Sequence, residues 1–305
     1  MTQLALTKSQ KRRRLRADLT GYGFLLPAIL GFALFILFPL VMSFALGFTE
    51  WNLVSGLKGI KFVGLDNFVK LFQDEYFVAS LKNNIIYTAL YVPLSLLLGL
   101  LLALLLNAKL YGRSLLRTMI FMPYISNIVA VSIVWMALFQ PTKGPINQLL
   151  ISLGVMDPPR WLASPDWAMF VLVIIGVWIN TGYNMVLFLA GLQNIPRELQ
   201  EAAVVDGATG VQRFWYVDLP LLTPTLFFLT ITGFMTSFKM FNSVKIITQG
   251  GPGMSTTVLV YYLYVQAFTL QKFGYSSAIA IVLFILIFLI TFLQWKGQKK
   301  WVNYV

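Results

Sequence analysis

Six long runs of apolar residues, nearly free of charge, limit what this chain can fold into. Each run exceeds the roughly 20 residues that an α-helix needs to cross a bilayer. Of the 305 residues, 58% are hydrophobic and only 11% are charged, and the mean hydropathy is +0.76, which is typical of a polytopic membrane protein. The predicted fold is an all-α integral membrane protein that is surrounded by membrane lipid. Its six predicted transmembrane helices are residues 22–48, 81–107, 118–139, 167–192, 219–242 and 274–295.

Lysine and arginine outnumber the acidic residues and give a net charge of +12. A basic chain can bind nucleic acid, but here the basic residues gather beside the apolar runs, where they set membrane topology. The basic tail 1–21 begins as a signal peptide does, yet the apolar run after it is too long for a signal core. We therefore predict that the tails 1–21 and 296–305 both lie in the cytoplasm, and we expect no nucleic-acid partner.

The residue types that are missing argue against several classes of chemistry. The chain has no cysteine and no histidine, so it lacks thiolate and imidazole ligands for a metal and the commonest catalytic base. Almost no charge lies within the predicted spans, which argues against a proton-driven carrier, while sodium coupling stays open. No G-x-x-x-x-G-K-[ST] sequence occurs, so ATP cannot be bound through a P-loop. We expect no catalytic residue, metal site or cofactor in this chain, and no enzyme activity.

A short amphipathic segment, Glu201–Pro220 (EAAVVDGATGVQRFWYVDLP), begins in the loop 193–218 between the fourth and fifth runs. Pro196 suits a first helical turn, and Asn194 is the expected N-cap. Gly207 is the expected left-handed residue that ends the helix. Because so short a helix is marginal in water, this protein or a partner must hold it.

The spacing within this segment resembles the EAA motif of permease subunits in bacterial ABC importers. The match is Glu-Ala-Ala, three residues, Gly, nine residues, Val, one residue, Leu-Pro, and Val217 stands where the family usually has Ile. The resemblance implies that this segment is the coupling helix, which docks in a groove on a cytoplasmic ATPase. The residues that would couple to the ATPase are Glu201, Ala202, Ala203, Asp206, Gly207, Leu219 and Pro220.

The resemblance also implies roles and partners. Glu201 would pair with a basic residue of the ATPase, and the small side chains of Ala202 and Ala203 would let the ATPase groove close around the helix. The partners would be a second homologous permease, two ATPase subunits that bind ATP and magnesium, and an extracytoplasmic solute-binding protein that docks on loops such as 140–166 and 243–273. Transport would follow alternating access across a bacterial plasma membrane.

Two further strings are similar to the same family. They are VGLDNFVKLF at 63–72, which matches a G-x-x-N-F/Y pattern, and TQGGPG at 248–253, which matches T-x-G-G-P. The apolar residues of 63–72 recur at helical spacing, so we expect a helix there that lies along the membrane surface. The resemblance covers roughly residues 20–300.

Neutral polar side chains beside aromatic rings form the candidate substrate pathway. Asn180 and Asn184 are four residues apart and therefore share a helix face, with Tyr183 beside them. Amides pair with the hydroxyls of a sugar, whose apolar ring face stacks on an aromatic ring. Packing between helices explains the same residues equally well. The residues assigned to the pathway are Asn180, Tyr183, Asn184, Gly233 and Ser237.

The chain is similar to the larger permease of the maltose transporter, without its extra N-terminal spans and large external domain. When the two are aligned on the EAA motif, Tyr183 coincides with a tyrosine of the sugar site, whereas Asn180, Gly233 and Ser237 occupy site positions with other residue types. The resemblance implies import of a sugar, with an oligosaccharide favoured. A glycerol-phosphate importer and a self-sufficient, sodium-coupled carrier stay open as alternatives, although for a phosphate the spans offer only Lys239.

Overall fold

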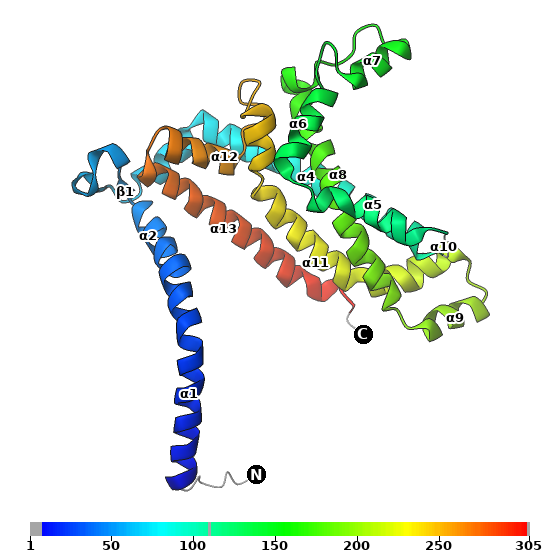
Figure 1. The fold of residues 1–305 in the computed structure, drawn as a ribbon, viewed down its shortest axis with the longest axis horizontal. Helices are drawn as coiled ribbons and strands as arrows, with labels where there is room; N and C mark the ends of the chain where they lie inside the picture. Colours follow the sequence, from blue (N-terminus) through cyan, green and yellow to red (C-terminus); the bar gives the residue numbers. More distant parts are fainter. Residues whose placement is uncertain (1–7, 109–110, 304–305) are drawn as a thin grey trace.

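The structure is a computed structural model that describes residues 8–108 and 111–303. Most of the described chain is helical (Figure 1). The α-helices are α1 (Lys8–Phe32), α2 (Phe38–Leu46), α3 (Asp66–Gln73), α4 (Glu75–Asn107), α5 (Arg113–Ile125), α6 (Ile128–Leu138), α7 (Pro145–Ser152), α8 (Pro165–Gln193), α9 (Arg197–Val205), α10 (Gly210–Arg213), α11 (Leu219–Phe238), α12 (Leu259–Tyr264) and α13 (Phe273–Gly297).

Shorter elements join or extend these helices. The π-helical segments are η1 (Ala33–Leu37), η5 (Phe214–Asp218), η6 (Val244–Thr248) and η7 (Val265–Thr269), and the 3-10 turns are η2 (Leu53–Ser55), η3 (Leu57–Gly59), η4 (Trp161–Ala163) and η8 (Gln298–Lys300). One antiparallel hairpin pairs β1 (Thr49–Glu50) with β2 (Lys61–Phe62).

Five helical stretches of the described chain are long and apolar enough to cross a membrane, and a bent pair of helices supplies a sixth candidate. These stretches are Asp18–Leu46, Glu75–Asn107, Pro165–Gln193, Gly210–Phe238 and Phe273–Lys300, and the pair is Arg113–Ile125 with Ile128–Leu138. Each overlaps one predicted run, and the all-α membrane fold is confirmed. The cytoplasmic placement of both termini and the limits of the predicted segments stay predictions.

The third apolar run is not one straight helix. α5 and α6 meet at 97°, because Ser126 and Asn127 between them have extended backbone. The Asn127 side chain accepts a hydrogen bond from the Val129 N–H at 2.9 Å and so caps α6. The sequence analysis predicted a single span at 118–139, since hydropathy alone cannot locate a break made by two polar residues after Pro123.

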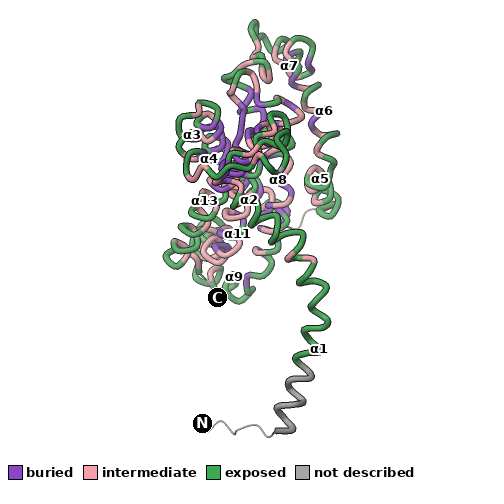
Figure 2. The backbone as a smooth tube through the Cα atoms, turned by 90° about the vertical axis from the view of Figure 1, so that its left-hand side faces the viewer, coloured by how far each residue is buried: buried purple, intermediate pink, exposed green. Residues whose placement is uncertain are grey.

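Helices α4 and α8 form the centre of the bundle and pack more extensively than any other pair of described elements. Figure 2 shows buried backbone concentrated around them. A Cβ on Gly99 of α4 would lie 2.6 Å from the Cβ of Asn184 on α8. Glycine therefore lets the two helices approach closely, as small residues commonly do in membrane bundles.

The first span stands apart from this centre. Figure 1 shows α1 extending away from the other helices, whereas α2 meets α13, where Phe44 and Phe284 pack edge to face with centroids 5.6 Å apart. Phe24 and Phe35 are 83% and 76% exposed in the chain alone. In a membrane protein, an apolar helix surface of this kind faces lipid or another subunit.

The polar connections divide between two ends of the bundle. Figure 2 shows α3 and α7 at one end and α9 with the C-terminal end of the chain at the other. The first end also holds the β1–β2 hairpin and α12 (Figure 1). It is called the outer end here because its loops are predicted to face outside, and the end that carries α9 is called the coupling end.

Candidate functional site

The two asparagines predicted to line the pathway lie on α8 but have different surroundings. Asn180 is half-buried, and its Nδ2 donates to the carbonyl of Gly176 one turn earlier at 3.0 Å. Asn184 is 7% exposed and packs against Gly99 of α4. Asn184 therefore lies in the α4–α8 contact, as the packing interpretation of the sequence requires.

Tyr183 carries the aromatic part of the predicted pathway. Its ring stacks on Tyr124 of α5, with centroids 4.8 Å apart and ring planes 19° from parallel. Tyr124 is 42% exposed and Tyr183 is half-buried, so the pair borders open space. An exposed stack of two tyrosines suits contact with the apolar face of a sugar ring.

Gly233 and Ser237 on α11 face α4 instead. The atoms nearest to a Cβ on Gly233 would be the methyl groups of Val92, at 3.5 and 3.6 Å. Ser237 is 1% exposed, and its hydroxyl accepts a hydrogen bond from Thr88 at 2.8 Å. Among the described residues, no hydrogen bond or ring contact joins Tyr183 to Gly233 or Ser237. The structure thus brings the five predicted residues to two places on α8 and α11.

Two adjacent asparagines in α4, which the sequence analysis missed, hold the outer end together. Asn84 is fully buried, donates to the carbonyl of Ser237 at 3.4 Å and accepts the N–H of Leu259 at 2.8 Å. Asn83 donates to the carbonyls of Met254 and Thr257 at 2.7 and 2.9 Å. A pair of amides inside an otherwise apolar helix was the sequence signal for this contact.

The TQGGPG string forms a loop that these asparagines anchor. Thr256 is fully buried, and its hydroxyl donates to the carbonyl of Gly251 at 2.7 Å and lies 2.8 Å from the hydroxyl of Thr248. Thr257 donates to the carbonyl of Gly250 at 3.0 Å. The hydroxyls of the two threonines that follow the string therefore close the loop. They donate hydrogen bonds to backbone carbonyls that would otherwise need water as a partner.

At the coupling end, the EAA segment forms the predicted helix, α9. Its N-cap is Pro196, without a side-chain hydrogen bond, whereas Asn194 is the C-cap of α8. The prediction that Asn194 caps α9 was wrong, because α8 continues to Gln193 before the chain turns. Gly207 has a φ of +78°, the left-handed conformation predicted for it.

The side chains of α9 are mostly open to solvent. Glu201, Ala202 and Asp206 are exposed, Ala203 is half-buried, and Val205 is 86% exposed. A shallow cavity of about 420 Å³ lies beside the helix and is bounded by Arg197, Gln200, Glu201, Val204, Val205 and Arg213. Val204 is 59% exposed as well, so this short helix leaves apolar surface open beside the cavity.

Asp218 links α9 to the fifth span. It is 4% exposed, and its carboxylate accepts hydrogen bonds from Arg213 Nε and Gln200 Nε2, each at 3.4 Å. Leu219 and Pro220, both half-buried, follow it directly and begin α11. Movement of α9 can therefore reach the span through a charged contact as well as along the chain.

Residues 95–296 match the family model described as "Binding-protein-dependent transport system inner membrane component". The chain belongs to this family. The permease is 38% identical to the probable ABC transporter permease protein YesP of Bacillus subtilis, over 100% of this chain and 98% of that protein. It is therefore a multi-pass inner membrane protein of the ABC importer class.

Two more relatives have names that state a substrate. The lactose transport system permease protein LacF of Rhizobium radiobacter is 35% identical, over 96% of the permease and 99% of that protein. The sn-glycerol-3-phosphate transport system permease protein UgpA of Yersinia pestis is 35% identical, over 93% of the permease and 95% of that protein.

The fold matches a solved transporter. The bacterial alginate ABC transporter, crystallised with an alginate pentasaccharide-bound periplasmic protein, contains a chain that superposes with a TM-score of 0.81. That chain is 24% identical, and the match covers 94% of the permease and 96% of it. The helical arrangement described above is thus that of an importer permease.

Proposed function

We propose that this permease forms half of the membrane channel of an ATP-driven sugar importer and works by alternating access. The partners are a second homologous permease, two ATPase subunits that bind ATP and magnesium, and an extracytoplasmic solute-binding protein. The observation that carries the proposal is the exposed helix α9, with the EAA motif on it, joined to α11 through Asp218.

The step that converts ATP binding into movement starts at α9. The ATPase covers Val204 and Val205, which are 59% and 86% exposed, and a basic residue of the ATPase pairs with Glu201. When the two ATPases close, α9 follows them, and the contacts of Gln200 and Arg213 with Asp218 carry the displacement to the start of α11. The spans then open toward the outside, and ATP hydrolysis resets them.

A neutral sugar suits the pathway better than a phosphorylated ligand. Tyr124 and Tyr183 offer a stacked aromatic surface, and Asn180 offers amide chemistry beside it. A phosphate calls for arginine or several converging donors, and the described spans bring none to the Tyr124–Tyr183 pair. The lactose relative favours the sugar, while the glycerol-phosphate relative makes that ligand the alternative to be tested.

Uptake of radiolabelled lactose and glycerol 3-phosphate, measured in cells that express the complete importer, tests both steps. Glu201→Lys reverses the charge on α9, and Gly207→Pro demands a φ near −65° where the chain needs +78°. Both variants are expected to stay in the membrane and to lose uptake and ATPase co-purification. Glu75→Lys, an exposed glutamate at the outer end, is the matched control.

Normal uptake by both α9 variants would refute the coupling role. A wild-type chain that purifies alone and transports in liposomes without an ATPase would favour the sodium-coupled carrier. Uptake of glycerol 3-phosphate, but of no sugar, would replace the substrate class and leave the coupling account intact.

A further inference from the structure

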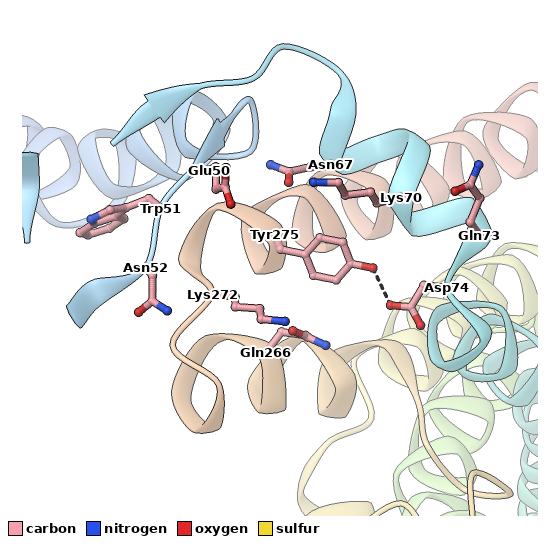
Figure 3. Close-up of a pocket in the computed structure, with 10 residues that line it drawn as sticks. All are labelled: Glu50, Trp51, Asn52, Asn67, Lys70, Gln73, Asp74, Gln266, Lys272 and Tyr275. Atoms are coloured by element: carbon pink, nitrogen blue, oxygen red, sulfur yellow. Dashed lines mark hydrogen bonds between the residues drawn. The ribbon is translucent and has the colours of Figure 1, made fainter. Parts of the chain in front are cut away.

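Two cavities of the permease have walls of opposite character, and the smaller of the two is polar. It lies at the outer end, has a volume of about 460 Å³, and has Asp74 and Tyr275 joined by a hydrogen bond in its wall (Figure 3). Burial disfavours the charge of Asp74, but hydrogen bonds from Tyr262, Tyr275 and the N–H groups of Tyr76 and Phe77 outweigh burial and lower its pKa. Asp74 is therefore an ionised part of that wall, with partners supplied by the chain itself.

The larger cavity is an apolar groove between α4, α5 and α8, with a volume of about 810 Å³. Leu98 and Met119 in its wall are 42% and 57% exposed in the chain alone, so the groove is open at the surface of the bundle. Thr181 contributes a hydroxyl to the wall, but this hydroxyl already donates to the carbonyl of Val177 at 2.7 Å. The apolar groove is defined by Leu98, Leu105, Met119, Pro123, Ile174 and Trp178.

The apolar groove lies on a different side of α8 from the predicted pathway. Ile174, Trp178 and Thr181 are spaced by four and three residues and therefore share one helix face. Tyr183 follows Trp178 by five residues, so it points about 140° away around the helix. The groove is thus a site separate from the predicted pathway.

The depth of the apolar groove in the membrane matches one leaflet. Its wall in α4 runs from Leu94 to Leu105, about 16 Å at the helical rise per residue, which is close to half of the roughly 30 Å of hydrocarbon in a bilayer. Leu106 and Leu192 lie in one buried cluster, so α4 ends beside the end of α8 that leads to α9. The groove therefore reaches from the middle of the spans toward the coupling end.

Two arginines stand where the groove reaches the coupling end. Arg113, Arg117 and Ile120 are spaced by four and three residues and share one face of α5, and Ile120 borders the groove. Arg113 is exposed. The Nε and Nη2 atoms of Arg117 are enclosed by protein and have no hydrogen-bond partner among the described residues. The ion pair recorded in the described chain is Arg213 with Asp218, so the charge of Arg117 is uncompensated there.

These charges favour a phospholipid over a helix of the second permease as the occupant. An apolar helix brings no anion, whereas a phospholipid brings an acyl chain for the groove and a phosphate at the leaflet surface, where arginine attracts it. The volume agrees with this choice. A helix with its side chains is about 10 Å across and fills about 1,250 Å³ over 16 Å of length, more than the roughly 810 Å³ of the groove.

We propose that the apolar groove binds one phospholipid of the leaflet at the coupling end, with an acyl chain between α4, α5 and α8 and the phosphate on Arg113. Arg113 is the group that touches the phosphate, because its side chain is exposed. The enclosed guanidinium of Arg117 does not touch it and attracts it through space, which is effective where water is excluded. The proposal depends neither on the imported substrate nor on the ATPase.

Photocrosslinking in lipid nanodiscs tests this site directly. The complete importer is placed in phosphatidylcholine nanodiscs that contain a small fraction of a probe lipid with a diazirine in one acyl chain. After irradiation, mass spectrometry of the peptides locates the label. The probes are phosphatidylglycerol, phosphatidylcholine and diacylglycerol, which lacks the phosphate. In the wild type, both phospholipid probes should label residues 94–105 and 119–123 more than the other exposed spans, and diacylglycerol should label them less. A stronger label from phosphatidylglycerol would add a preference for an anionic headgroup.

Two variants separate the acyl chain from the phosphate. Leu98→Trp fills the groove with a larger side chain at an exposed position and should lower the phospholipid label about fivefold. Leu289→Trp, the same change at a 48% exposed position of α13, is the matched control. Arg113→Gln should lower the phospholipid label about fivefold, the effect of one basic residue at a membrane surface, and should leave the diacylglycerol label unchanged. Lys299→Gln, also exposed at the coupling end, is its control.

Several results would overturn the proposal. Label spread evenly over all exposed spans, or equal label in the wild type and Leu98→Trp, would mean ordinary boundary lipid only. Equal label from diacylglycerol and the two phospholipids would remove the contact between Arg113 and a phosphate. Label that appears in the groove of the separated permease, but is absent from the groove in the complete importer, would assign the groove to a helix of the second permease.

Discussion

At the outer end, buried amides of α4 tie distant loops into the bundle, whereas at the coupling end α9 presents its side chains to solvent. Asn83 and Asn84 reach backbone groups more than 150 residues away in the sequence. Among the described residues, α9 is joined to the rest of the permease by the chain itself and by the contacts of Asp218 with Gln200 and Arg213, each at 3.4 Å. The difference supports the proposal that another protein covers the coupling end, where the side chains of α9 are exposed in this chain.

The largest effect on folding is expected where the outer end is tied together. Asn84→Leu would leave the Leu259 N–H without its acceptor inside the protein, which should cost about 2 kcal/mol. The thermal unfolding midpoint of the purified importer measures the loss. Asn194→Leu, the same change at an exposed position of the coupling end, should alter stability by less than about 0.5 kcal/mol. Equal losses at the two positions would remove the contrast between the ends.

A change at Asp218 should affect transport more than stability. Asp218→Asn removes the ion pair with Arg213 but keeps an acceptor for Gln200. Loss of about 1 kcal/mol of coupling corresponds to about fivefold slower uptake, while the ATPase should still co-purify. Asp66→Asn, at an exposed position of the outer end outside the predicted docking loops, is the control. Uptake that is unaffected by Asp218→Asn would mean that the chain alone transmits the movement of α9.

The stability of the outer end should depend on pH, because Asp74 titrates there. Because the folded state lowers the pKa of Asp74 below its ordinary value of 3.8, its stabilising effect is fully present above that value. The effect is lost as pH falls through the folded pKa. The unfolding midpoint of wild type should therefore exceed that of Asp74→Asn at pH 6, and the gap should close below pH 3.8. A gap independent of pH would show that ionisation of Asp74 contributes nothing.

The smallest effect on stability is expected on the exposed face of α9. Val205 is 86% exposed, so Val205→Ala should change the stability of the isolated permease by less than about 0.5 kcal/mol. The same variant should weaken ATPase binding, because its methyl groups are covered only in the complex. Quantitative co-purification at rising salt and detergent measures this. Destabilisation of the isolated permease would place Val205 in an internal contact instead.

The sequence predicted the membrane helices and the left-handed Gly207 because both follow from local physics. Hydropathy identifies a membrane span from the residues of that span alone. A helix end that needs a positive φ selects glycine. The break at Ser126 and Asn127 was missed, since two polar residues between apolar runs also fit an unbroken helix. The assignment of Asn194 as the N-cap of α9 failed because α8 continues to Gln193, and the Asn194 N–H still donates to carbonyls of α8.

The contacts of the candidate sites were harder to predict. Asn84 and Ser237 are 153 residues apart, and a single sequence does not show which face of α11 meets α4. For the same reason the sequence did not show that the Ser237 hydroxyl accepts a hydrogen bond from Thr88, and the assignment of Ser237 to the pathway stays a prediction. The EAA motif could be recognised because its spacing is contained in one short segment, and its coupling role stays a prediction.

Cysteine cross-linking at α9 tests most directly whether the coupling end is completed by an ATPase. The chain has no cysteine of its own, so Val205→Cys places a single thiol on α9. Val54→Cys places one at a similarly exposed position, 80% open, at the outer end. In native membranes treated with a short bifunctional reagent, Val205→Cys should join the permease to an ATPase subunit and Val54→Cys should not. Absence of an ATPase product from Val205→Cys, in membranes where that variant still transports, would contradict the account.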